Sequence, residues 1–163
     1  MYEHLADTLQ LWGEIVAEEY KNKLDNEGIT ASGNLANSVK MVYNENGVLF
    51  EVSLSLADYW KNIEDGRGPT KNDGDGAVRR NILEWIRVKP VIPRPMENGK
   101  LPTEAQLAYL ISRKIHTLGY EGKQPLKRTM DELREEIVKD IKVAVEKDLS
   151  REVTVILHSI DGK

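Results

Sequence analysis

Residues 37–55 read NSVKMVYNENGVLFEVSLS. Apolar and polar side chains alternate along both of its halves, which is typical of β-strands that bury one face. Asn46-Gly47 stands between the halves and favours the tight turn of a hairpin. The stretch therefore predicts an antiparallel hairpin with one face on the core and the other in water.

Helical spacing dominates the sequence on both sides of this hairpin. Before it, apolar residues recur every three or four positions from Leu5 to Leu24, and Gly28 favours the end of that helix. After it, a short helix is expected over 57–64 and longer helices over 77–88, over 103–118 and from Met130 to Leu149. Alternation then returns over 153–158, which predicts a third strand.

These elements predict an α+β fold in a single domain, residues 1–163. Its small antiparallel sheet consists of the hairpin and the C-terminal strand, and the long N-terminal helix and the helices of the C-terminal half cover it. Residues 70–102 are rich in Gly, Pro, Asp, Asn and Arg, so they form an inserted arm. Pro90, Pro93 and Pro95 make part of this arm a stiff, extended strap.

Composition excludes several classes of protein. The 163 residues include 23 basic and 27 acidic side chains, a net charge of -4, so the whole chain has no electrostatic attraction to nucleic acid or to an anionic membrane. Without cysteine, neither disulfides nor thiolate chemistry are available. The N-terminus lacks the pattern of a secretory signal, and no apolar run has the length of a membrane span. We expect a protein made in the cytoplasm that leaves it only inside a larger particle.

The sequence contains no convincing set of catalytic or metal-binding residues. His4, His116 and His158 are far apart, and no serine stands in a nucleophile motif. The carboxylates of the first and last long helices are typical of solvated helix faces. We therefore expect no enzyme activity, no metal and no cofactor.

A local excess of positive charge lies in the inserted arm. Arg79, Arg80, Arg87, Lys89 and Arg94 are interrupted only by Glu84. Two hypotheses fit this basic stripe: it contacts nucleic-acid phosphates, or it pairs with an acidic helix face on a neighbouring subunit.

Apolar side chains in the arm and beside the short helix also suggest an interface. The arm has too poor a core to bury Trp85, Ile86, Val91 and Ile92, so another chain is expected to cover them. In the short helix, Ile63 is expected to face the sheet and Trp60 a partner. The predicted interface residues are Trp60, Glu64, Arg67, Arg79, Arg80, Trp85, Ile86, Arg87, Val91, Ile92 and Arg94.

Three segments together resemble the tail-completion or neck proteins of tailed bacteriophages, the head-to-tail connectors. Ser32 to Ser38 match the family's TGNLRxS turn, which leads into a hairpin. Residues 57–66, ADYWKNIEDG, match its YAxYVExG segment, and Gln124-Pro125-Leu126 match the Pro-Phe-Leu start of its long helix.

This resemblance implies a structural role in a virion. Members of the family form oligomeric rings between portal, neck and tail, and they have no catalytic residues to carry over. The implied partners are further copies of the chain, other portal, neck or tail proteins and, in passing, genomic DNA, with no membrane contact. The implied location is the virion, after assembly in the host cytoplasm.

Overall fold

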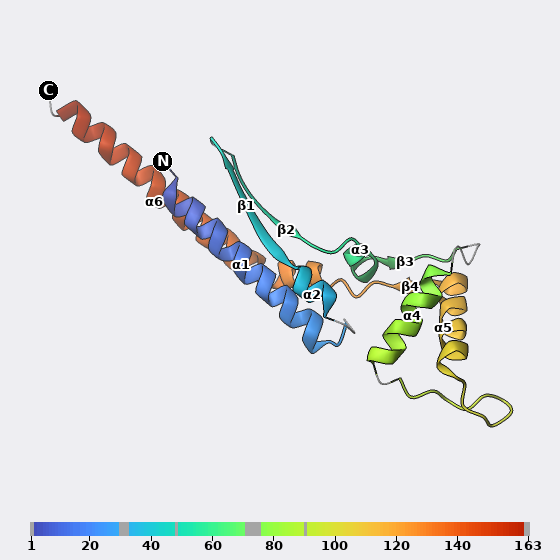
Figure 1. The fold of residues 1–163 in the computed structure, drawn as a ribbon. Helices are drawn as coiled ribbons and strands as arrows, with labels where there is room; N and C mark the ends of the chain where they lie inside the picture. The colour runs from blue at the N-terminus through green and yellow to red at the C-terminus, as the bar shows by residue number, and fades with distance from the viewer. Residues whose placement is uncertain (1, 30–32, 48, 71–75, 90, 162–163) are drawn as a thin grey trace.

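The computed structural model describes residues 2–29, 33–47, 49–70, 76–89 and 91–161, which form a mainly helical α+β fold (Figure 1). The elements of the body are α1 (Glu3–Asn26), α2 (Asn34–Ser38), β1 (Lys40–Asn46), β2 (Leu49–Ser55), α3 (Trp60–Glu64) and α6 (Pro125–Asp161). The elements of a second part, which we call the lobe (residues 66–121), are β3 (Gly66–Arg67), α4 (Ala77–Val88), α5 (Glu104–Leu118) and β4 (Tyr120–Glu121).

The predicted hairpin is confirmed. Strands β1 and β2 pair antiparallel from Lys40 opposite Ser55 to Asn46 opposite Leu49. Gly47 has a φ of 65° at the turn, a conformation that glycine adopts without strain. Met41 and Tyr43 of β1 are partly buried and their neighbours exposed, so the period-two pattern sets the inner face of the hairpin.

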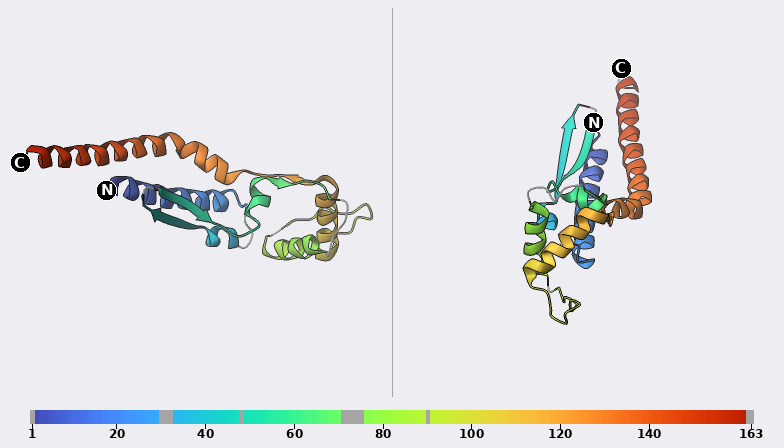
Figure 2. Two further views of the ribbon diagram at one scale, coloured as in Figure 1. Left: turned by 90° about the horizontal axis from the view of Figure 1, so that it is seen from above. Right: turned by 90° about the vertical axis from the view of Figure 1, so that its right-hand side faces the viewer.

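Helix α1 packs against the hairpin on one side and against α6 on another. Gly13 marks its closest approach to the hairpin, since a β-carbon there would lie 2.6 Å from Val52 Cγ1 and 2.8 Å from Met41 Cγ. Helix α6 runs antiparallel to α1 and continues well past its N-terminus (Figure 2).

Polar contacts along the two helices fix their register. Glu27 and Arg128 form a two-pronged ion pair of 2.7 and 2.8 Å, and Lys23 lies 2.5 Å from Glu132. Trp12 Nε1 donates to Asp140 at 3.2 Å, and Arg151 binds Glu3 at the far end. Exposed ion pairs contribute little stability, so these contacts select the register while apolar burial holds the helices together.

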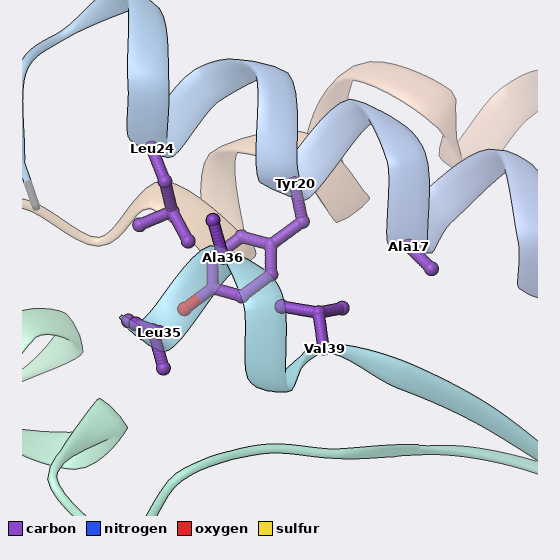
Figure 3. Close-up of a cluster of buried hydrophobic side chains, with 6 residues drawn as sticks. All are labelled: Ala17, Tyr20, Leu24, Leu35, Ala36 and Val39. Carbon is purple, nitrogen blue, oxygen red and sulfur yellow. The ribbon is translucent and has the colours of Figure 1, made fainter. Parts of the chain in front are cut away.

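The main hydrophobic core lies between α1, α2 and the start of β1. Figure 3 shows Ala17, Tyr20 and Leu24 of α1 facing Leu35, Ala36 and Val39. The sequence pattern missed α2, because a five-residue helix is too short to show a period. Ser38 ends it and receives the N–H of Ala57 at 2.9 Å, which ties this core to the end of the hairpin.

The predicted third strand is wrong. Residues 153–158 continue α6 as a helix, and each of the two sheets in the described residues has two strands. Each residue added to an existing helix gains a hydrogen bond within that helix, whereas a new strand needs a partner strand along its whole length. Thr154 Oγ1 donates to the carbonyl of Ser150 at 2.9 Å, so this β-branched residue is accommodated within the helix.

The helices of the C-terminal half do not cover the sheet as predicted. Helix α5 packs on α4, and α6 packs chiefly on α1. The predicted arm, 70–102, is thus one part of the longer lobe. Its residues 71–75 and Pro90, and Ser32 of the family motif, lie outside the described residues.

We predict a pH effect from one buried phenol. Among the described residues, the Tyr20 hydroxyl is the buried side-chain polar atom without a hydrogen-bond partner. Burial, together with the nearby Glu64 carboxylate, raises the pKa of Tyr20 to about 12. The unfolded chain loses this proton near pH 10 and the folded chain does not, so stability falls as the pH rises from about 10 to about 12.

The Tyr20→Phe variant tests this. We expect it to be as stable as the wild type at pH 7, or more stable by up to about 1 kcal/mol, because it removes an unpaired buried hydroxyl. Its urea denaturation curves should lose less stability above pH 10 than those of the wild type. The other tyrosines remain in both proteins, so an identical alkaline loss would contradict the assignment.

Candidate subunit interface

A backbone crossing, which we call the neck, joins the lobe to the body. Residues 63–67 run antiparallel to 120–124, with Gly66 opposite Glu121 and Arg67 opposite Tyr120. The N–H of Lys123 donates to the Ile63 carbonyl at 2.9 Å and extends the pairing into α3. Backbone hydrogen bonds therefore hold the two segments of the neck together where the body meets the lobe.

At two positions of the neck, the backbones of the two segments lie too close together for any side chain. A β-carbon at Gly122 would lie 1.9 Å from the carbonyl oxygen of Glu64. One at Gly66 would lie 2.3 Å from the carbonyl oxygen of Tyr120, and Gly66 also has a φ of 80°. Real β-carbons do not approach backbone this closely, so the crossing requires glycine at both positions.

Glu64 is buried at the neck and caps the N-terminus of α6. Its two carboxylate oxygens accept the N–H groups of Leu126 at 3.1 Å and Lys127 at 2.8 Å. These are the second and third residues of α6, whose N–H groups have no partner within the helix. Glu64 therefore has an intramolecular role, and we remove it from the predicted interface.

The lobe is an antiparallel pair of helices with a small core. Ile86 of α4 and Ala108 of α5 are its buried apolar residues among those described. At one end, Arg87 Nε lies 3.3 Å from Glu104 Oε2; nearer the other, the Arg79 guanidinium lies 5.7 Å from the centre of the Tyr109 ring. Thr103 and Gln106 form a capping box at the start of α5, the helix that the sequence predicts over 103–118.

His116, near the end of α5, contacts Thr70 at the end of the lobe that adjoins the neck. It is buried, its Nδ1 lies 2.5 Å from Thr70 Oγ1, and its carbonyl accepts the N–H of Thr70 at 2.8 Å. This histidine is therefore a structural residue of the lobe.

Positive charge gathers at the end of the lobe near His116. Because α4 and α5 are antiparallel, Arg113 and Lys114 near the end of α5 lie at the same end as Arg79 and Arg80 at the start of α4. All four side chains are exposed, and no acidic residue stands within 76–83 or 105–118. Arg113 and Lys114 are not among the predicted interface residues, although they form an adjacent basic pair in a helical stretch, 105–118, that contains no acidic residue.

The strap between α4 and α5 projects from the lobe (Figure 1). Ile92 is 92% exposed, Arg94 is exposed and Val91 is half-buried. At the base of the strap, Lys89 Nζ donates to the carbonyl of Gly28, which connects the lobe to the end of α1. Lys89 also lies 6.0 Å from the centre of the half-buried Trp85 ring.

The structure divides the predicted interface residues into two groups. Trp60 packs partly buried against the main core, and Ile86 is buried in the lobe, so each already has an intramolecular contact. Arg67 is half-buried in β3. The exposed group consists of Arg79, Arg80, Arg87, Ile92 and Arg94, all of them in the lobe.

An apolar cleft of about 320 Å³ lies between α1, β2, α3 and α6. Its lining includes Trp12, Val52, Trp60 and Met130, and none of the residues that line it is ionisable. Within the described ranges, no group of three or more His, Asp or Glu side chains is placed to hold a metal ion. In the same part of the chain, no helix combines the length and the apolar character that crossing a membrane requires.

Comparison with known proteins gives no match for this chain among family models, curated proteins or solved structures.

We predict that the Glu64 cap contributes to stability. Glu64→Ala leaves the part-buried N–H groups of Leu126 and Lys127 without this partner and should lower the free energy of unfolding by about 0.5 to 2 kcal/mol. Glu64→Gln keeps one acceptor oxygen and should lose less. Urea denaturation measures both, and equal stability of Glu64→Ala and the wild type would contradict the cap.

A second prediction concerns the width of the neck. Gly122→Ala places a methyl group against the Glu64 carbonyl and should destabilise the protein by about 1 to 3 kcal/mol. Gly99 of the strap also has open space around a β-carbon built there, but it is unsuitable as a control because its φ of 74° would strain an alanine. Gly68 has the same open space without a positive φ, so Gly68→Ala is the matched control. Hydrogen exchange should show faster exchange at residues 120–124 in Gly122→Ala alone; unchanged exchange would contradict the narrow crossing.

Proposed function

We propose that the chain is a structural virion protein that forms an oligomeric ring at the head-to-tail junction of a tailed bacteriophage, without catalysis of its own. The observation that carries the assembly is the solvent-accessible surface of 11735 Å². A compact monomer of this mass, 18.5 kDa, exposes about 8,200 Å². The excess of about 3,500 Å² is larger than the roughly 1,600 Å² that a subunit buries against two neighbours at about 800 Å² each, so the chain has surface to spare for two such contacts.

The exposed surface also has the character of an assembling protein. The free end of α6 carries the exposed Leu149, Val153 and Ile156, and the strap carries Ile92. Both strands of the hairpin have an open edge within the described residues, which offers backbone groups to a further strand. Such surfaces favour association over life as an isolated monomer.

The virion assignment rests on the family resemblance. The residues that carry it hold the body together: Leu35 is in the main core, Ser38 binds Ala57, and Glu64 caps the helix that begins at Pro125. The proposed partners are further copies of the chain, portal, neck or tail proteins and, in passing, genomic DNA. The alternative is a small factor that binds nucleic acid, or an enzyme, through the basic lobe.

Electron microscopy and gel-shift assays test this function. We expect the purified chain to form closed annular particles of one defined mass, and antibody labelling to place it at the neck of phage particles from cells that carry its gene. A chain that stays monomeric, together with tight binding of duplex DNA by the monomer, would support the alternative. Labelling elsewhere on the phage particle than the head-to-tail junction would contradict the virion assignment.

A further inference from the structure

Charge is distributed very unevenly between the two parts of the molecule. The lobe, residues 66–121, holds ten basic and six acidic residues, a net charge of +4. The rest of the chain holds 13 basic and 21 acidic residues, a net charge of -8, and the two parts give the -4 of the whole. A molecule with oppositely charged parts attracts its own copies in a head-to-tail orientation.

Four of the body's acidic residues line the outer face of α1. Asp7, Glu14, Glu18 and Asp25 are all exposed, at helical spacings of seven, four and seven. This face lies opposite the side of α1 that carries the buried residues Trp12, Val16 and Tyr20, so neither the hairpin nor α6 covers it. Lys21, at its edge, lies 3.8 Å from Glu18. We call this the acidic face.

An exposed leucine stands in the middle of the acidic face. Leu11 is 55% exposed, with Asp7 one turn before it and Glu14 one turn after it. An apolar centre with a charged rim is the usual anatomy of a protein interface.

The outer face of α5 likewise carries an exposed leucine beside charged residues, here of the opposite charge. Leu110 is 48% exposed, and Arg113 and Lys114 follow it by three and four residues. On the acidic face, Glu14 follows Leu11 by three residues and Glu18 follows Glu14 by four. We call the surface formed by Leu110, Arg113 and Lys114 the basic face.

We infer that the basic face of one copy docks on the acidic face of the next copy. Leu110 packs against Leu11, and Arg113 and Lys114 pair with Glu14 and Glu18. The two surfaces differ, so every copy keeps one of each available after a contact forms, and association continues from copy to copy. This inference rests on the proposed ring and names the surfaces through which its subunits meet.

Charge reversal on one face at a time tests the docking. The acidic-face variant is Glu14→Lys with Glu18→Lys, and the basic-face variant is Arg113→Glu with Lys114→Glu. All these side chains are exposed and all the residues favour helices, so both variants should fold as the wild type does. Asp131→Lys with Glu135→Lys on α6 is the control, since it makes the same change in charge as the acidic-face variant at exposed positions on another helix.

Sedimentation velocity gives the readout. We expect wild-type self-association to weaken as salt rises, and each face variant to associate at least about tenfold more weakly than the wild type and the control at low salt. An equimolar mixture of the two face variants should associate and grow again, because their two intact faces match each other and their two reversed faces are also opposite in charge. Combining all four reversals in one chain should restore growth.

Other outcomes would overturn the docking. If the face variants still form rings as the wild type does, the docking surfaces are wrong while the ring stands. If the wild type is monomeric under all conditions, both proposals fail. If only the basic-face variant changes, and what it loses is binding of a short DNA duplex, then the basic face serves nucleic acid.

Discussion

The chain crosses itself at the neck, and this crossing holds both the body and the lobe in place. Residues 63–66 and 120–124 are separated by the whole lobe in sequence, yet they lie close enough to exclude side chains at Gly66 and Gly122. The body is completed only when the chain returns through this crossing to start α6, and the lobe is closed by the same contact. A larger residue at Gly122 would therefore disturb both parts of the molecule.

Two carboxylates from distant segments begin the two long helices. Glu64 accepts the second and third N–H groups of α6, and Asp148, buried in α6, accepts the N–H groups of His4 and Leu5 at the same positions of α1. At the start of α1, the adjacent Tyr2 side chain makes no capping hydrogen bond. Each helix thus begins where another element places a carboxylate, which makes helix formation depend on tertiary structure.

The sequence predicts elements whose pattern lies within one segment, and it misses contacts between segments that are far apart in the chain. Alternation predicts the hairpin, and helical spacing predicts α1, α4 and α5, because each pattern lies within one element. The same alternation over 153–158 misleads, since Val153 and Ile156 also continue the helical spacing from Leu149 and a growing helix needs no partner. Glu64 reads as an exposed residue of a short helix, because its partners at Leu126 and Lys127 lie 62 and 63 residues away. The basic stripe of α4 is visible, but its extension to Arg113 depends on the pairing of α4 with α5.

The neck also connects the fold of one subunit to the geometry of the proposed assembly. The acidic face belongs to the body and the basic face to the lobe, so the angle between them within one chain is set by the crossing at Gly66 and Gly122. In head-to-tail association this angle is repeated at every subunit and decides whether the assembly closes into a ring or continues as a filament. We expect a crossing held by backbone hydrogen bonds to hold this angle more closely than a flexible linker would, and a linker would permit assemblies of many sizes. The tight neck is thus the feature of this chain that best suits a ring of one defined size.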